Sequence, residues 1–530
     1  MKKIKKITYI GLAIAVASLL FVNAGATNMS IETDDVNKMM VQVPFTIKHH
    51  EQTMVTENLG AAGLVSVGSE DDDYCPGITK DQNGNIVVTW TTDVSILETH
   101  IGLGYSADGS IWNANYVSLE DAMPKFSDIA FINGANFDGG GDFVGLWGVF
   151  GDVLGSQQGF YRMTDITDDT TLEVLTWTGE SLDITHCAIS DNSWYKDNNY
   201  DYVGPTNMYI QYSDLCGIDK CPLHVFTDGL DAGGVMFHDC QEGLATAPAY
   251  DPDLEGIHDG DPAQTVDDYV LLTWQYDDPV EGSKIVFKKI IPDEESDIEY
   301  TPYEFYIGPG ANPNIGASGD RSVITYVNNG NVMSAYSSDK GTNFDIATIG
   351  PGNYPAVYMS GSSAYCVYIN NGNVYLVISD DAGATWGAPE KVNDVDGTVV
   401  EEENSIDIHP AGIVWTDNRD ENKDIYYRAG VASPEITIGT ISGGVGVSAE
   451  IKNVGTAAAT DVQWSIDLEG GLVLVGAHAD GTISTLADGA SQTVKIGFVL
   501  GFGGVTIKVT ADGASKSADA TVLLFLVTGL

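Results

Sequence analysis

The chain has 530 residues, and its 75 acidic against 24 basic residues give a formal charge of −51. A field of that sign repels nucleic acid and anionic membranes, so the sequence predicts neither as a partner. Hydrophobic residues make up 43% of the chain, which is enough to build packed cores and excludes global disorder. The length favours two domains, one of them large.

The N-terminus has the pattern of an export signal. Four lysines lie within residues 2–6, an uncharged apolar run follows over residues 7–22, and Ala24-Gly25-Ala26 fits a cleavage site. We therefore expect residues 1–26 to be removed and the mature chain to be secreted or held at the cell surface. An uncleaved anchor is the alternative, although the run is shorter than the ~20 residues that a spanning helix needs. No later run is long enough, so no membrane span is expected after cleavage.

Six cysteines occur in a chain expected to reach an oxidising compartment, at positions 75, 187, 216, 221, 240 and 366. Cys216 and Cys221 enclose a four-residue loop and are the best candidate for a disulfide, with Cys187 and Cys240 as a weaker pair. The remaining two lie in or beside apparent strands and can act as small buried hydrophobic residues. Paired Cys-x-x-Cys motifs and histidine clusters are absent from the sequence, so no zinc site is predicted.

Internal repetition is the strongest signal in the sequence. Residues 313–344 and 355–386 align without gaps, and Tyr-Val-Asn-Asn-Gly-Asn-Val in the first copy matches Tyr-Ile-Asn-Asn-Gly-Asn-Val in the second. Asn-Gly between two alternating runs predicts a β-hairpin. Looser copies of the hairpin occur at residues 85–106, 143–164, 200–214, 269–290 and 413–429.

These repeats predict an all-β fold, a six- or seven-bladed β-propeller over residues 27–432, with seven blades favoured. Each unit has about four short strands and no helical pattern, and such sheets bury their faces by stacking radially. The last unit ends after three strands. A strand from the N-terminal region, Val41–Ile47, is expected to complete it and close the ring.

A second motif lies inside the repeats. Residues 379–386 read Ser-Asp-Asp-Ala-Gly-Ala-Thr-Trp and fit S-x-D-x-G-x-T-W, and residues 337–344 and 106–112 are degenerate copies. The motif resembles the Asp box of sialidase-type (BNR-repeat) propellers. The residues that carry the resemblance are Ser379, Asp381, Gly383, Thr385, Trp386, Ser337, Asp339, Gly341, Phe344, Ser106, Asp108 and Trp112. The resemblance implies a structural role, in which the carboxylate binds turn N–H groups, the glycine supplies positive φ and the aromatic residue packs on the blade.

The same resemblance suggests a second hypothesis, an exo-sialidase-like glycoside hydrolase. Such enzymes hold the substrate carboxylate with three arginines and use a tyrosine nucleophile paired with a glutamate, together with an aspartic acid. This chain has only Arg162, Arg321, Arg419 and Arg428, and the Arg-Ile-Pro signature of those enzymes is missing. We therefore predict no catalytic residues and rank the enzyme second.

One acidic segment suggests a cation. Residues 251–261 read Asp-Pro-Asp-Leu-Glu-Gly-Ile-His-Asp-Gly-Asp, which could hold calcium but lacks the spacing of an EF-hand loop. A solvated acidic loop is the favoured interpretation. The sequence therefore predicts no metal site and no cofactor, and calcium stays open as an alternative.

The composition changes near residue 433, where Tyr and Trp become rare and Val, Ala, Gly and Thr dominate. Seven short runs over residues 433–530 predict an immunoglobulin-like β-sandwich: 436–441, 445–452, 462–468, 472–475, 493–498, 505–510 and 521–527. Ile451-Lys452-Asn453-Val454-Gly455-Thr456 resembles the strand and turn of CARDB-type surface modules, which implies a spacer or adhesive role.

Together these features predict a secreted or cell-surface binding or adhesion protein whose propeller binds an extracellular glycan or protein. An architectural envelope component without a discrete ligand is a third hypothesis. The sequence does not identify the ligand-binding residues.

Overall fold

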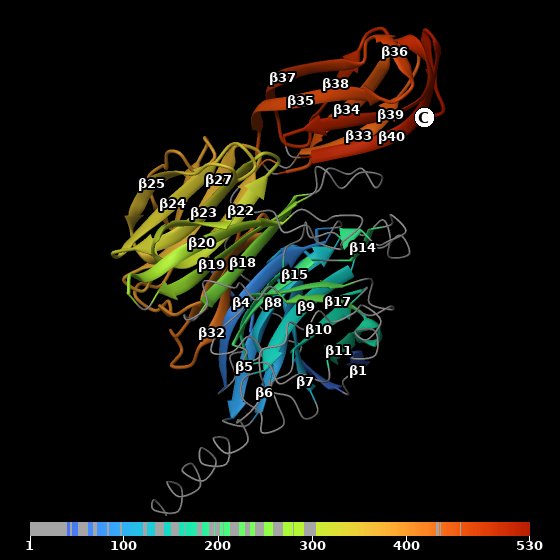
Figure 1. The fold of residues 1–530 in the computed structure, drawn as a ribbon. Coiled ribbons are helices and arrows are strands. Elements are labelled where there is room, and N and C mark those ends of the chain that lie inside the picture. The colour runs from blue at the N-terminus through green and yellow to red at the C-terminus, as the bar shows by residue number, and fades with distance from the viewer. Residues whose placement is uncertain are drawn as a thin grey trace, which may run out of the picture.

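The computed structural model describes most of residues 40–132, the strands and some turns of 142–290, and nearly all of 304–530. Apart from a 3-10 turn at Asp169–Thr171, the secondary structure of the described residues is β-strand (Figure 1). The prediction of an all-β propeller followed by an immunoglobulin-like module is therefore confirmed. No helix in the described part of the chain is long and apolar enough to cross a membrane.

Seven sheets in the described residues share one plan, in which four antiparallel strands follow one another. We number them first to seventh along the chain. The first three are β4 (Asp72–Lys80), β5 (Ile86–Ser95), β6 (Glu98–Ser106) and β7 (Asn113–Leu119); β8 (Pro124–Ile132), β9 (Asp142–Val149), β10 (Gln158–Met163) and β11 (Glu173–Trp177); and β12 (Asp183–Ile189), β15 (Thr206–Tyr212), β16 (Pro222–Thr227) and β17 (Gly234–His238). A short hairpin, β13 (Tyr195–Lys196) and β14 (Tyr202–Gly204), extends from the third.

The fourth to seventh sheets continue the plan. They are β18 (Ala249–Ile257), β19 (Tyr269–Asp278), β20 (Gly282–Ile290) and β21 (Glu304–Pro309); β22 (Ala311–Ser318), β23 (Arg321–Asn328), β24 (Asn331–Ser337) and β25 (Asp345–Pro351); β26 (Asn353–Ser360), β27 (Ser363–Asn370), β28 (Asn373–Ser379) and β29 (Glu390–Lys391); and β30 (Ile406–His409), β31 (Gly412–Asp417) and β32 (Asp424–Ala429), with β3 (Gly63–Leu64) as the fourth strand of the seventh sheet.

The first strand of every sheet lies on the inside of a closed ring. Each of these strands contacts its counterpart in the next sheet, from β4 through β8, β12, β18, β22 and β26 to β30, and β30 contacts β4 again. Local sequence supports the plan: in the fifth sheet Asn328 pairs with Asn331, so the hairpin turn is the dipeptide Asn329-Gly330, and both residues have positive φ. Asn-Gly favours that turn because its twist matches the twist of the flanking strands.

The strand that completes the seventh sheet differs from the one expected. Gly63 and Leu64 pair with Tyr427 and Tyr426 of β32, whereas residues 41–42 and 45–47 belong to two other sheets. There β1 (Met40–Gln42) adds a fifth strand beside β11, and β2 (Phe45–His50) adds one beside β7. The closing strand lies just before β4 because the chain must reach the seventh sheet immediately before it enters the first.

Two cysteines have the role predicted for them. Cys75 and Cys366 are free thiols, 6% and 0% exposed. Burial raises the pKa of Cys75 to about 12, so this thiol stays protonated at neutral pH. The predicted Cys216–Cys221 bridge and the signal sequence at 1–26 lie outside the described residues.

The C-terminal module is a sandwich of two sheets. One sheet has β33 (Ile436–Ser442), β34 (Val447–Asn453) and β38 (Ser491–Ile496); the other has β37 (His478–Leu486), β35 (Ala459–Glu469), β39 (Leu500–Ala511), β40 (Ala514–Leu524) and β41 (Leu526–Thr528), with β36 (Leu472–Val475) paired to β39. β37 was not predicted from the sequence, because only two of its residues, Ile483 and Leu486, are well buried and the strand has little apolar pattern. The single strand expected over 521–527 is two strands, since Leu524 has a φ of 57° and turns the chain.

Candidate ligand-binding face

A bulge shapes the inner strand of several sheets. The residue before a proline has positive φ at Cys75, Asn312 and Tyr354, where φ is 53°, 50° and 50°. This conformation is unusual for a side chain, and more so before proline. The strand register shifts at each of these points. Three inner strands have a polar residue near this point: Asn314 follows Pro313 at the bulge of β22, Asp253 follows Pro252 at a register shift in β18, and Asp407 lies in β30.

Those polar residues join neighbouring sheets around the axis. The inner strand is an edge strand, so its outer N–H groups lack partners in their own sheet. Asp253 in the fourth sheet accepts the N–H of Ile315 in the fifth at 2.6 Å, and Asn314 accepts the N–H of Val357 in the sixth at 2.6 Å. At the seam Asp407 of the seventh sheet accepts the N–H of Ile78 in the first at 2.9 Å. We call Asp253, Asn314 and Asp407 the axial belt.

The belt corrects the interpretation of residues 251–261 as a solvated acidic loop. Residues up to Ile257 form β18, and the carboxylate of Asp253 joins two sheets. Burial raises the pKa of Asp253 well above its usual range, the N–H groups of Ile315 and Leu254 oppose this, and Asp407 adds repulsion. Among the described residues no group of three acidic, histidine or cysteine side chains is placed to hold a metal ion.

The three turns beginning at Ser106, Ser337 and Ser379, here called the Ser-x-Asp turns, lie between the third and fourth strands of their sheets. In the last one Asp381 accepts the N–H of Thr385 at 2.7 Å, and Ser379 accepts the N–H of Gly383 at 2.8 Å. The other two have corresponding bonds, such as Asn343 N–H to Asp339 and Gly109 N–H to Ser106. These bonds hold the turn internally, so its carboxylate is engaged by its own backbone.

Each Ser-x-Asp turn also packs on the preceding sheet. Trp112 of the first sheet meets Tyr427 of the seventh, with ring centroids 5.0 Å apart, and Phe344 of the fifth meets Phe287 of the fourth at 4.8 Å. Trp386 of the sixth donates its indole N–H to Ser334 of the fifth at 3.0 Å. The turns therefore hold adjacent sheets together.

The glycine of such a turn is tested by a matched pair of substitutions. Gly341 has a φ of 72°, and an added Cβ would lie 2.6 Å from the Phe287 ring; Gly330 has a φ of 74° and open space around it. Gly330→Ala should cost about 1–2 kcal/mol from backbone strain alone. Gly341→Ala should cost a further 1–3 kcal/mol, roughly the range for overpacking. Urea unfolding measures both, and equal losses would contradict the packing of this turn against the fourth sheet.

The C-terminal module docks on the face that carries the Ser-x-Asp turns. Asp512 lies 3.2 Å from Arg321, which follows the first turn of the fifth sheet, and Ser360 in the sixth sheet donates to the carbonyl of Pro434. The backbone N–H of Lys340, in the Ser-x-Asp turn that begins at Ser337, donates to the carbonyl of Asp320 in this first turn, so the two turns lie side by side. The Asn-Gly turns lie at the other end of β23, which has eight residues and spans about 26 Å. The module therefore leaves the Asn-Gly face uncovered over the fifth and sixth sheets.

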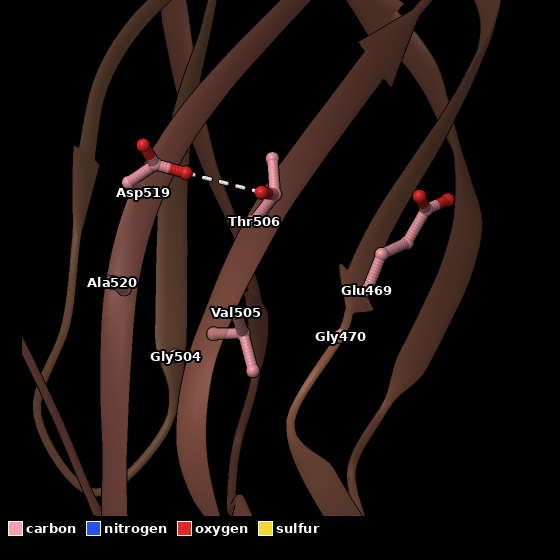
Figure 2. A pocket seen from close by; sticks show the side chains of 7 residues that line it. All are labelled: Glu469, Gly470, Gly504, Val505, Thr506, Asp519 and Ala520. Atoms are coloured by element: carbon pink, nitrogen blue, oxygen red, sulfur yellow. Dashed lines mark hydrogen bonds between the residues drawn. The ribbon is translucent and has the colours of Figure 1, made fainter. Parts of the chain in front are cut away.

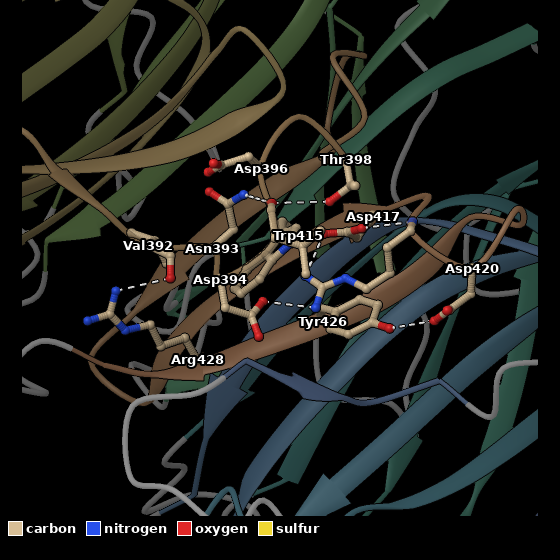
Figure 3. A network of polar contacts seen from close by, with 12 residues as sticks. Val392, Asn393, Asp394, Asp396, Thr398, Trp415, Asp417, Asp420, Tyr426 and Arg428 are labelled. Atoms are coloured by element: carbon tan, nitrogen blue, oxygen red, sulfur yellow. Dashed lines mark hydrogen bonds and ion pairs between the residues drawn. The ribbon is translucent and has the colours of Figure 1, made fainter.

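A polar network lies on this second face, where the sixth and seventh sheets meet (Figure 3). The guanidinium of Arg419 binds Asp417 at 2.7 Å and Asp394 at 2.9 Å, and it lies 3.8 Å from the centre of the Tyr426 ring. Trp415 donates its indole N–H to Asp417 at 3.1 Å. Burial would raise the pKa of Asp417, but Arg419 and Trp415 hold it below its usual range.

The network contains one buried carboxylate and two exposed ones. Asp417 is 0% exposed, whereas the side chains of Asp394 and Asp396 are 43% and 81% exposed. Arg419 Nε is buried and has no partner within the described residues. Exposed carboxylates can accept hydrogen bonds from the hydroxyl groups of a polar, uncharged ligand.

Three of the four arginines are described with their side chains, and each meets a carboxylate of its own. Arg321 pairs with Asp512 of the C-terminal module, Arg419 with Asp417 and Asp394, and Arg428 with Glu390. Arg321 and Arg419 lie on opposite faces of the ring. The side chain of Arg162 lies outside the described residues.

The seam between the first and seventh sheets buries two more carboxylates. Ser66 donates to Asp424 at 3.2 Å and accepts the N–H of Ile425 at 2.9 Å, and Thr92 donates to Asp73 at 2.6 Å. The second oxygen of Asp73 is buried without a partner among the described residues. Burial raises the pKa of Asp73 to about 7 and that of Asp424 to about 6.

Comparison with known proteins identifies the C-terminal module. The family model described as CARDB matches residues 440–521. No curated protein matches the chain. Solved structures that resemble it include the α-L-arabinofuranosidase Arb93A from Fusarium graminearum (10% identity, 71% of this chain and 98% of that chain covered, TM-score 0.38), the Dos1 propeller (10%, 75% and 92%, 0.39) and a family 117 glycoside hydrolase from Zobellia galactanivorans (11%, 63% and 89%, 0.31). Similarity at this level gives no information about a ligand of this chain.

The sequence did not reveal the axial belt or the Arg419 network. The belt leaves a weak signal in the sequence. The inner strands of six sheets contain a similar tripeptide, in which Asp, Asn, Gly or Ala is followed by an apolar residue: Pro-Gly-Ile, Ser-Asp-Ile, Pro-Asp-Leu, Pro-Asn-Ile, Pro-Ala-Val and Ile-Asp-Ile. The network has none, because Asp394 and Arg419 come from different sheets and meet only in the fold.

Proposed function

We propose that this chain is a secreted or cell-surface binding protein whose propeller binds a neutral extracellular glycan on the face that carries the Arg419 network. The observation that carries the proposal is the arrangement of Asp394, Asp396 and Arg419 on the face away from the C-terminal module. Export rests on the basic start and apolar run at the N-terminus.

Charge determines the class of glycan. Both terminal nitrogens of Arg419 bind carboxylates and Lys391 pairs with Asp396, so each of these cations already has an acidic partner. The chain's formal charge of −51 repels acidic ligands as well. Exposed carboxylates such as that of Asp394 accept hydrogen bonds from sugar hydroxyls.

A glycan array probed with the full chain, followed by calorimetry on the best ligand, tests this proposal. Neutral glycans should bind and sialylated ones should not. Asp394→Asn keeps an acceptor for Arg419 and should weaken binding at least tenfold, which is about 1.4 kcal/mol. Asp320→Asn, an exposed carboxylate on the opposite face, is the control and should bind as the native chain does. Binding that is confined to sialylated glycans, or unaffected by Asp394→Asn, would refute the proposal.

The sialidase-type hydrolase gives a different result in a companion assay. It requires turnover of a fluorogenic sialoside, whereas a binding protein leaves this substrate intact. Turnover that is lost on replacing Arg419 or Arg428 would establish the hydrolase instead.

A further inference from the structure

An apolar surface covers one end of the C-terminal module. Leu472 of β36, Phe502 of β39, Leu523 of β40 and Leu526 of β41 are register neighbours across four strands. They are 60%, 64%, 46% and 42% exposed. Further exposed apolar residues lie on these strands or in loops of the same module: Val445, Leu474, Val475, Phe498, Leu524, Phe525 and Leu530. We call these eleven residues the apolar end.

The side chains of the apolar end carry no charge. Residues 436–449, 470–477, 496–507 and 520–530 contain no Asp, Glu, Lys or Arg. Two charged residues lie at a nearby shallow pocket, where Thr506 donates to Asp519 and Glu469 lies on the neighbouring strand (Figure 2). An uncharged centre with a polar edge is the composition of an association surface.

The summed exposed area of the apolar end is larger than the largest apolar patch of a typical monomer. Large apolar side chains each cover on the order of 100–200 Å² when fully exposed, so eleven that are about half exposed present on the order of 1,000 Å². A typical monomer has a largest apolar patch of roughly 300–600 Å². A standard protein interface buries about 800 Å² on each partner, so this surface is large enough for a stable dimer.

We propose that the apolar end joins two copies of this chain through their C-terminal modules. The charge distribution favours this occupant: residues 433–530 hold only nine of the 75 acidic residues, with four lysines. An isologous contact of the apolar end with itself buries no charged side chain.

The geometry keeps the acidic propellers apart in such a dimer. The module contacts the propeller through Asp512, just beyond the last residue of β39, whereas the apolar end lies around the first residues of that strand. The twelve residues of β39 span about 40 Å. The label of β36 and the C-terminus lie on the side of the module turned away from the propeller (Figure 1). That separation is several times the Debye length of about 8 Å at physiological salt, so repulsion between the two propellers is screened.

Sedimentation velocity of the full chain over a range of concentrations tests the dimer. The native chain should reach the dimer mass, and added salt should strengthen association because it screens the remaining repulsion. Phe502→Asp places a charge in the centre of the row and should give a monomer with unchanged circular dichroism and melting. The control is Ile346→Asp, a 52% exposed residue of the propeller, which should leave the dimer intact.

Three results would overturn the proposal. They are a native chain that stays monomeric at every concentration and salt, a Phe502→Asp variant that still dimerises, and an Ile346→Asp variant that does not. Phosphatidylcholine vesicles serve as a second probe. A monomeric native chain that sediments with these vesicles, and loses this property in Phe502→Asp, would make a lipid surface the occupant and would also reject the dimer.

Discussion

Trp112→Ala should lower the free energy of unfolding by about 3–5 kcal/mol, the range for removing a large buried aromatic side chain. Trp112 is 2% exposed, packs edge-on against Tyr427 and donates its indole N–H to the carbonyl of Gly109 at 3.2 Å. Its core cluster joins residues of the first and seventh sheets with Val65 beside the closing strand. The substitution therefore leaves a cavity at the seam where the ring closes.

Trp386 provides the matched control for this substitution. It occupies the same position in its Ser-x-Asp turn but is only half-buried, between two sheets that are also joined through the chain. Trp386→Ala should cost clearly less than Trp112→Ala in equilibrium urea unfolding. Equal losses, or a loss below about 1 kcal/mol for Trp112→Ala, would show that the first and seventh sheets do not share a core.

Asp73→Asn should make the chain more stable at neutral and alkaline pH. The pKa of Asp73 is raised from 3.8 to about 7, chiefly by burial, and the charge of Asp424 adds to the rise. Between pH 4 and pH 7 the folded chain holds a proton that the unfolded chain has lost, so the stability from this group falls as pH rises. The loss is complete above pH 7 and amounts to about 4 kcal/mol, at 1.36 kcal/mol for each pKa unit.

The asparagine keeps the shape of the side chain and carries no charge at any pH. The native chain and Asp73→Asn should therefore be similarly stable near pH 4, and the variant should gain on the native chain up to pH 8. Urea unfolding at a series of pH values measures this difference, and the exposed Asp345→Asn is the control. A constant difference between native and variant chains across the series would show that Asp73 does not titrate at the seam.

The repeated hairpins could be predicted from the sequence because their information is local. Asn329-Gly330 and Asn371-Gly372 specify their turns whatever surrounds them, and both pairs have the positive φ that the turn needs. Ser379, Asp381 and Gly383 likewise bond within a few residues of one another. Such features survive in a single sequence because neighbours along the chain are also neighbours in space.

Features that depend on distant residues could not be predicted in the same way. The closing strand consists of only Gly63 and Leu64, too short for an alternating pattern, so the longer apolar run at 41–47 was the better candidate. Asp253 was interpreted as part of a solvated loop because its partner, the N–H of Ile315, is 62 residues away. The apolar end was interpreted as ordinary strands, since exposure of Phe502 and Leu523 depends on which face of the sheet they occupy.

Hydrogen exchange of the segment that closes the ring tests the central claim most directly. The amide of Val65 donates to the carbonyl of Ile425 at 2.8 Å, and Ser66 is bonded to β32, so a peptide covering residues 62–66 should exchange as slowly as one covering β32. Mass spectrometry of the native chain at neutral pH would show this protection. Complete exchange of residues 62–66 within seconds, beside a protected β32, would mean that the N-terminal strand does not close a ring of sheets.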